Sequence, residues 1–398
     1  MRRRFVVCAF LALAVAWPGS HLLQADDAED HYTQGMGFQA RGDLAQAIAE
    51  YRKAVTLRPG YADAHLKLGM GLHLQGDLEG AIAEYRQALR LKSTDDATAH
   101  NDLGIALAAR GDFDEAAAEQ RESIRLNPER PEAHNDLGIT LRGKGDLDGA
   151  IAEYQEALRL APAYPEALNN LGNAVSARND WTGSVERYRQ ALGLAPDYAD
   201  AHNNLGIALM HLGDLKGAEA EYHQTLAIAP RCVQAHYNLA MALKSEGDLE
   251  GAVAAYREAI ALDPGYSDAH NNLAVALEQQ SHFQAAAAEF RQAVALKPAD
   301  AALRNNLGYA LVEAEEWDNA IAALEESLRV RPGDPAALGN LGLALAGKGQ
   351  YQAAVSKYQE ALLGDPGSAT LRARLASAQA KLKESSKPAL KAANGPVR

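Results

Sequence analysis

Apolar residues recur along this chain with the period of amphipathic helices, in short segments separated by turns. Leu205 and Leu209 fall on one side of a helix at 3.6 residues per turn, and Ala218 and Tyr222 do the same in the following segment. A Gly-Asp pair at positions 213–214, typical of a turn, lies between the two segments. The pattern predicts two packed helices joined by a tight turn.

The turn pair repeats at intervals of 34 or 35 residues. It occurs at Gly42-Asp43, Gly76-Asp77, Gly111-Asp112, Gly145-Asp146, Gly213-Asp214 and Gly247-Asp248. Asn179-Asp180 fills the gap in this series, and Ser281-His282, Glu315-Glu316 and Gly349-Gln350 continue its register with altered turns. A proline, as in Pro196 and Pro230, closes every copy except the second and lets the next copy begin. Ten copies therefore run over residues 28–367.

Each copy resembles the tetratricopeptide repeat, a helix–turn–helix of 34 residues. Repeat four carries the motif in Leu137-Gly138, Ala150, Tyr154, Ala157 and Pro162. The resemblance implies an all-α fold, a right-handed superhelix (α-solenoid) of ten helix pairs whose concave face is lined mainly by the first helices. The chain departs from the family where it usually has a tryptophan in the first helix, because most copies have histidine there: His31, His65, His100, His134, His202, His236 and His270.

The two ends differ from the repeats. Three arginines precede an apolar run of 13 residues, Phe5–Trp17, which is shorter than the ~20 residues of a membrane-spanning helix. We therefore expect residues 1–25 to be a cleavable signal peptide. Residues 368–383 repeat the first-helix pattern without a partner and are expected to form a capping helix. Residues 384–398 mix Ser, Lys, Pro and Gly and are expected to be a disordered, basic tail.

Composition limits the classes of binding partner and the cellular compartment that the protein can have. The formal net charge of −13 argues against nucleic acid, which requires clustered Lys and Arg. Removal of residues 1–25 would leave Cys232 as the one cysteine, so no intramolecular disulfide could form. With the signal peptide, this favours an exported bacterial protein, periplasmic or secreted.

The residues give little support for catalysis or for a metal or cofactor. Histidines of neighbouring repeats are separated by at least one helix-packing distance of ~8–10 Å and cannot converge on one ion. Packing with a satisfied imidazole is the better interpretation. The chain contains no P-loop, no G-x-G-x-x-G and no G-x-S-x-G motif. We expect a protein that is not an enzyme and that holds no metal and no cofactor.

Two adjacent positions of the first helix are rich in asparagine. A helical wheel of repeat six places Asn203 on the open side and Asn204 on its flank, toward the concave groove. The position of Asn203, here called the first amide position, holds Asn101, Asn135, Asn169, Asn203, Asn271 and Asn305. The position of Asn204, the second amide position, holds Asp102, Asp136, Asn170, Asn204, Asn238, Asn272, Asn306 and Asn340 in repeats three to ten.

A primary amide suits a peptide backbone, because its oxygen accepts from an N–H and its NH₂ donates to a C=O. The row is similar to the asparagine ladder of the O-linked N-acetylglucosamine transferase family, which implies binding of extended polypeptide. The catalytic half of that family is absent from this chain. Asp102 and Asp136 should make the N-terminal part of the groove prefer neutral or basic segments.

Other interpretations of the asparagines and of the function stay open. The asparagines could bond neighbouring repeats and specify their register, could be simply solvated, or could persist from recent duplication. A scaffold that binds extended segments of partner proteins is the leading hypothesis for the function. The alternatives are a structural component of a cell-envelope, secretion or pilus assembly complex, and an accessory subunit of a glycosyltransferase.

Overall fold

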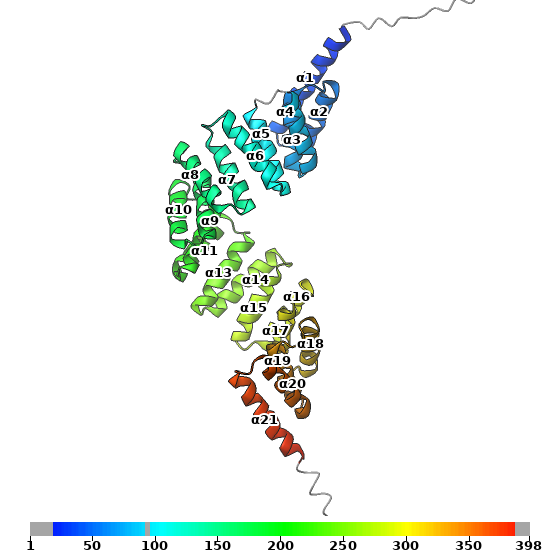
Figure 1. Cartoon of the computed structure of the whole chain (residues 1–398), viewed down its shortest axis with the longest axis vertical. Helices are drawn as coiled ribbons and strands as arrows, with labels where there is room; N and C mark the ends of the chain where they lie inside the picture. Colours follow the sequence, from blue (N-terminus) through cyan, green and yellow to red (C-terminus); the bar gives the residue numbers. More distant parts are fainter. Residues whose placement is uncertain (1–18, 92–95, 387–398) are drawn as a thin grey trace, which may run out of the picture. The chain divides into compact units, whose positions relative to one another are not determined.

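All regular secondary structure in the described part of the chain is α-helical, as predicted. The computed structural model describes residues 19–91 and 96–386, which form 21 helices grouped into two compact units that divide after Leu194 (Figure 1). Most of the predicted signal peptide (1–25) and of the predicted basic tail (384–398) lies outside the described residues. In the described part of the chain, no helix has both the length and the apolar character needed to cross a membrane.

The first unit contains five helix pairs. Its first helices are α1 (Gly19–Ala40), α3 (Ala62–Gln75), α5 (Ala97–Arg110), α7 (Pro131–Lys144) and α9 (Pro165–Ala177). Its second helices are α2 (Leu44–Leu57), α4 (Leu78–Leu91), α6 (Phe113–Leu126), α8 (Leu147–Leu160) and α10 (Trp181–Leu194).

The second unit contains five more pairs and a final single helix. Its first helices are α11 (Ala199–His211), α13 (Val233–Glu246), α15 (Ser267–Gln279), α17 (Ala301–Glu313) and α19 (Pro335–Gly347). Its second helices are α12 (Leu215–Ile228), α14 (Leu249–Leu262), α16 (Phe283–Leu296), α18 (Trp317–Val330) and α20 (Tyr351–Gly364), and α21 (Ala369–Ser386) packs on α20.

The recurring turn has a simple stereochemical basis. Gly213 adopts a left-handed conformation with φ of 82°, which costs glycine no steric clash, and the Asp214 carboxylate then accepts from the backbone N–H of Gly217 to cap α12. Asn179, Ser281 and Glu315 take the same conformation, with φ of 63°, 62° and 60°. The three altered turns therefore keep the predicted register.

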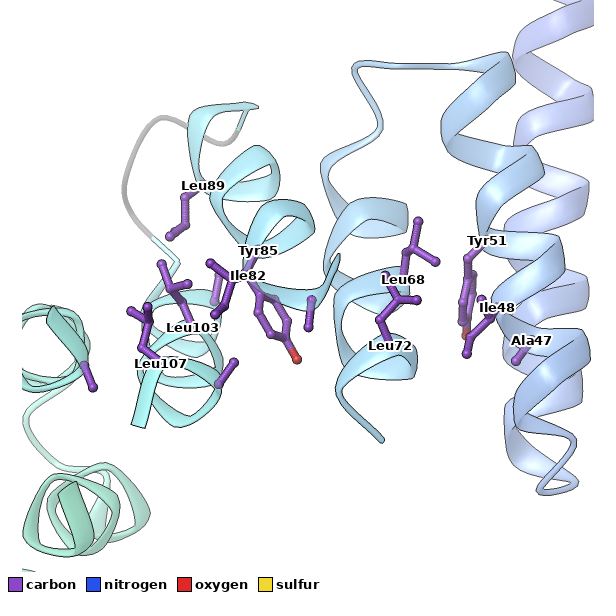
Figure 2. Packing of buried hydrophobic residues seen from close by; sticks show 14 residues of the cluster. Ala47, Ile48, Tyr51, Leu68, Leu72, Ile82, Tyr85, Leu89, Leu103 and Leu107 are labelled. Carbon is purple, nitrogen blue, oxygen red and sulfur yellow. The ribbon is translucent and has the colours of Figure 1, made fainter. Parts of the chain in front are cut away.

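Helices pack through small residues that face rings. A Cβ atom added at Gly206 would lie 2.6 Å from a ring carbon of Tyr222, so the absence of a side chain there allows α11 and α12 to approach closely. Within each unit, the second helix of a repeat also packs on the first helix of the next. Figure 2 shows this contact in the first unit, where Tyr51 and Ile48 of α2 face Leu68 of α3.

Within each unit, first helices of neighbouring repeats also contact one another. In the first unit α5 contacts both α3 and α7, and in the second unit α17 contacts α19. The first helices of each unit are called here the first-helix layer, and this layer carries both amide positions.

Candidate peptide-binding surface

The two amide positions are bonded to each other between repeats. In the first unit Asn170 Nδ2 donates to Asn135 Oδ1 across 3.0 Å. The second unit repeats this bond from Asn238 to Asn203 (3.1 Å), from Asn306 to Asn271 (3.4 Å) and from Asn340 to Asn305 (3.0 Å). Each bond therefore joins the second amide position of one repeat to the first amide position of the repeat before it.

Two variants of the bond show that its chemistry is adaptable. In repeat seven Tyr237 occupies the first amide position, and its hydroxyl accepts from Asn272 Nδ2 across 2.7 Å. Between repeats three and four the donor is reversed, because Asp136 can only accept: Asn101 Nδ2 donates to Asp136 Oδ2 across 2.8 Å. The pairing therefore needs one donor and one acceptor, and either repeat can supply the donor.

The pairing fails between repeats two and three. Leu66 occupies the first amide position of repeat two, opposite Asp102. The Asp102 Oδ2 atom is buried and has no hydrogen-bond partner among the described residues. Burial raises the pKa of Asp102 to about 6, opposed by the nearby charge of Arg130.

Asp136, unlike Asp102, receives hydrogen bonds from neighbouring amide groups. Burial raises the pKa of its carboxyl group too, and hydrogen bonds from Asn101 and Asn135 oppose that shift. The two acidic side chains predicted on the groove therefore lie in the first-helix layer, half-buried, with different hydrogen-bonding environments.

The prediction that the first amide position faces the open side is wrong for three residues. Asn101, Asn135 and Asn169 are only 2%, 5% and 5% exposed. A wheel drawn for a single repeat omits the first helices of neighbouring repeats, and in the first unit α5 contacts α7 and α7 contacts α9. Asn203, Asn271 and Asn305 are half-buried.

The second amide position is more accessible. Asn170, Asn204, Asn272, Asn306 and Asn340 are half-buried, and Asn238 is 7% exposed. One inter-repeat bond uses only a fraction of an amide's capacity, which is two donated and two accepted bonds. The Nδ2 groups of Asn203 and Asn305 donate to no described residue. The bonded pairs therefore keep hydrogen-bonding capacity for a ligand.

The histidines have hydrogen-bond partners, as predicted: six pair with a glutamate of their own repeat, and His236, which has Ala255 at the glutamate position, bonds the carbonyl oxygen of Pro230. The Nδ1 atom lies within hydrogen-bonding distance of a glutamate 19 residues later, at 2.6 Å for His202 and Glu221 and 2.7 Å for His270 and Glu289. The Nε2 atom of His202 lies 2.9 Å from the carbonyl oxygen of Pro196. These histidines therefore tie the two helices of a repeat to the loop that precedes it.

The described residues contain no cluster of three or more His, Cys, Asp or Glu side chains that could hold a metal ion. Cys232 is a free, half-buried cysteine at the start of α13.

Sequence reasoning missed the exceptions to the repeat. Gln120 stands where seven copies have a buried tyrosine: Tyr51, Tyr85, Tyr154, Tyr188, Tyr222, Tyr256 and Tyr358. Leu66 and Tyr237 are two of the four residues that interrupt the first amide position. All three are visible when the copies are aligned, but their meaning depends on which side chain of the neighbouring repeat they meet.

Comparison with known families gives a consistent result. Family models described as tetratricopeptide repeat match residues 32–96, 101–165 and 305–370, and also 199–232 and 267–300. A model described as TPR repeat matches residues 176–213 and 241–281. A comparison with curated proteins gives no match.

Solved structures of tetratricopeptide proteins are similar to this chain. A tetratricopeptide repeat protein from Parabacteroides merdae is 16% identical, with a TM-score of 0.53, over 63% of this chain and 99% of that protein. PilF from Pseudomonas aeruginosa is 21% identical (TM-score 0.46; 53% and 96% covered). YrrB, described as a TPR protein with an unusual peptide-binding site, is 22% identical (TM-score 0.40; 46% and 94% covered).

Proposed function

Because the chain belongs to the tetratricopeptide repeat family, we propose that it is a non-catalytic scaffold that binds extended segments of partner proteins. The ligand lies along the layer of first helices, and the amide pairs hold its main chain. Affinity is modest, because ordering a flexible segment costs free energy.

The observation that carries this proposal is the orientation of the amides. The bond from Asn238 to Asn203, and its counterpart from Asn340 to Asn305, fixes each side chain in one rotamer before any ligand arrives. The unused donors of Asn203 and Asn305 can then meet peptide carbonyl groups at little further entropic cost. The structural role of the asparagines and their role in binding are therefore compatible.

We further propose that the protein is exported. The basic and apolar residues at 2–17 and the acidic start at Asp26 support this. Expression of the full chain in a bacterium, cell fractionation and N-terminal sequencing of the recovered protein test it. Recovery outside the cytoplasm with Asp26 as the first residue is expected, and a cytoplasmic protein that still begins at Met1 would contradict export.

A double variant separates binding from folding. In Asn203→Asp with Asn305→Asp, the carboxylates still accept from Asn238 and Asn340, as Asp136 accepts from Asn101, but they lack the NH₂ donor. Peptides selected on the native protein from a displayed random library should bind this variant about tenfold more weakly, by the loss of two hydrogen bonds.

The matched control makes the same chemical change elsewhere in the second unit. Gln224 and Gln359 are exposed on the second helices α12 and α20, so Gln224→Glu with Gln359→Glu adds equal charge without touching the amide pairs. Fluorescence anisotropy should give native affinity for this control, and circular dichroism should show intact helices in both proteins. Equal peptide affinity for the amide variant and its control would refute the proposed role of the amides.

A further inference from the structure

The aromatic position of the second helix is interrupted by a polar residue in the first unit. Seven repeats place a buried tyrosine there, repeat eight has Phe290 and repeat nine has Leu324. Repeat three has Gln120, which is 0% exposed and whose Nε2 and Oε1 atoms both lack a partner among the described residues. A buried amide without hydrogen bonds costs free energy, so its presence requires an explanation.

A second departure from the repeat lies beside the first. The residue three positions after the Leu of the Leu-Gly motif is alanine in most copies, such as Ala106 and Ala174, but is Thr140 in repeat four. Thr140 is 1% exposed, and its hydroxyl also has no partner among the described residues. Gln120 thus replaces a tyrosine and Thr140 an alanine in neighbouring repeats, and the two side chains do not hydrogen-bond each other.

Both residues line one hollow of about 430 Å³ between α5, α6 and α7. Its walls include Ile105, Phe113 and Ile139, and Asp136 and Arg142 also contribute to it. The second amide position, represented by Asp136, therefore borders the hollow. A polypeptide segment bound along the first helices would cross the opening of this hollow.

We propose that this hollow is a specificity pocket for a tyrosine side chain of the bound segment, an inference that rests on the proposed function. In repeat two the chain's own Tyr85 faces Gly69 of the first helix and shares one core with Leu103 of the next first helix. Repeat three lacks that ring, and the ligand supplies it. The ring contacts the apolar walls. The polar atoms of Gln120 and Thr140 are covered in the unbound protein, so both side chains turn toward the hollow to meet the hydroxyl of the ligand.

The unpaired atoms distinguish tyrosine from other occupants. The Gln120 amide and the Thr140 hydroxyl require both a donor and an acceptor, and a phenolic hydroxyl provides both. Phenylalanine would leave every polar atom unpaired. A lysine ammonium group has donors only, so the Gln120 NH₂ group would remain unsatisfied.

Selection from a displayed random peptide library tests the pocket in the full chain. Gln120→Tyr fills the hollow with the residue of seven other repeats, so it should fold, and Phe290→Tyr makes a comparable change at a position that already holds a ring. Peptides selected on the native protein and on Phe290→Tyr should share a tyrosine at one position, and peptides selected on Gln120→Tyr should not. Enrichment of lysine instead, no enrichment, or tyrosine enrichment that survives in Gln120→Tyr would each overturn the pocket and leave the proposed function standing.

Direct binding of a fragment tests the pocket independently of groove binding. N-acetyl-tyrosinamide should shift the NMR signals of the Gln120 side-chain amide in the ¹⁵N-labelled chain. Titration should give an affinity about tenfold higher than that of N-acetyl-phenylalaninamide. Thr140→Val, which keeps the shape and removes the hydroxyl, should reduce this preference severalfold. No shift at the solubility limit, or an equal response to both fragments, would overturn the inference. If the fragment binds the pocket but no peptide is selected, the pocket stands and the proposed function fails.

Discussion

At the scale of single residues, Asp102 lies in an environment that disfavours the charged form of its carboxyl group. Its carboxylate is largely buried opposite Leu66, whereas Asp136 receives a bond from Asn101. The folded protein therefore favours the protonated form of Asp102, with a pKa of about 6 against an ordinary value of 3.8. Between pH 4 and 6 the folded state binds more protons than the unfolded state, so this group makes stability fall as pH rises through that window.

Asp102→Asn should stabilise the protein by about 1–2 kcal/mol at pH 7.5 and by almost nothing at pH 4, because only the ionised carboxylate is penalised. Urea unfolding at the two pH values measures the difference. Asp136→Asn is the matched control, since Asp136 has amide partners and should show a smaller gain at pH 7.5. A gain for Asp102→Asn that is the same at both pH values would contradict the assignment.

The amide pair of Asn203 and Asn238 makes a second prediction at this scale. A double-mutant cycle with Asn203→Ala and Asn238→Ala should give a coupling energy of about 0.5–1.5 kcal/mol, the range for one hydrogen bond. Unfolding of the four proteins by denaturant provides the measurement. Additive losses would show that the 3.1 Å bond contributes no stability.

At the scale of elements, the turns within repeats show how strongly one conformation is required. Glycine occupies the left-handed position in most copies, but Glu315 adopts it with φ of 60° between α17 and α18. A side chain with a Cβ atom pays about 1–2 kcal/mol for that conformation. The packing of the two helices therefore holds the turn in place against local preference.

Glu315→Gly should raise the free energy of unfolding by about 1 kcal/mol, because it removes this steric penalty at a small entropic cost. Glu315→Ala removes the same charge and keeps the Cβ atom, so it should give no such gain. Thermal unfolding of the three proteins checks the difference. Equal stabilisation by both substitutions would point to charge rather than backbone conformation.

At the scale of the whole molecule, stability in a solenoid is set by each repeat and its contact with the next. Repeat three is weakened on both counts, by Gln120 in its core and by the unpaired Asp102 at its contact with repeat two. Repeat seven has the ring of Tyr256 in its core and a complete amide bond to repeat six, although the Tyr256 hydroxyl also lacks a partner among the described residues. Local unfolding should therefore be more frequent in repeat three than in repeat seven.

Native-state hydrogen exchange on the full chain should show amide protons of α5 and α6 exchanging about tenfold faster than those of α13 and α14. Mass spectrometry of peptic fragments resolves these helices. Gln120→Tyr should slow exchange in α6 and leave α14 unchanged. Equal protection in the two repeats of the native protein would show that Gln120 and the unpaired Asp102 do not weaken repeat three.

Most of the fold could be predicted because its determinants are local. The 3.6-residue period, the left-handed turn at Gly213 and the helix-ending proline Pro196 act within a few residues of the chain. The altered turns at 281 and 315 were assigned correctly for the same reason. The candidate site was less predictable, because a wheel of one helix cannot show that Asn135 is buried.

The repeat, its helices, its turns and the small and aromatic residues of its core can be derived from the amino-acid sequence, since each follows from periodicity and backbone stereochemistry. Which side chains meet between repeats is a property of the folded molecule. Asn238 bonds Asn203 across 35 residues, and Gln120 and Thr140 line one hollow from different repeats. Such distances depend on how helices are stacked, and that geometry arises from packing between repeats, which no single segment encodes.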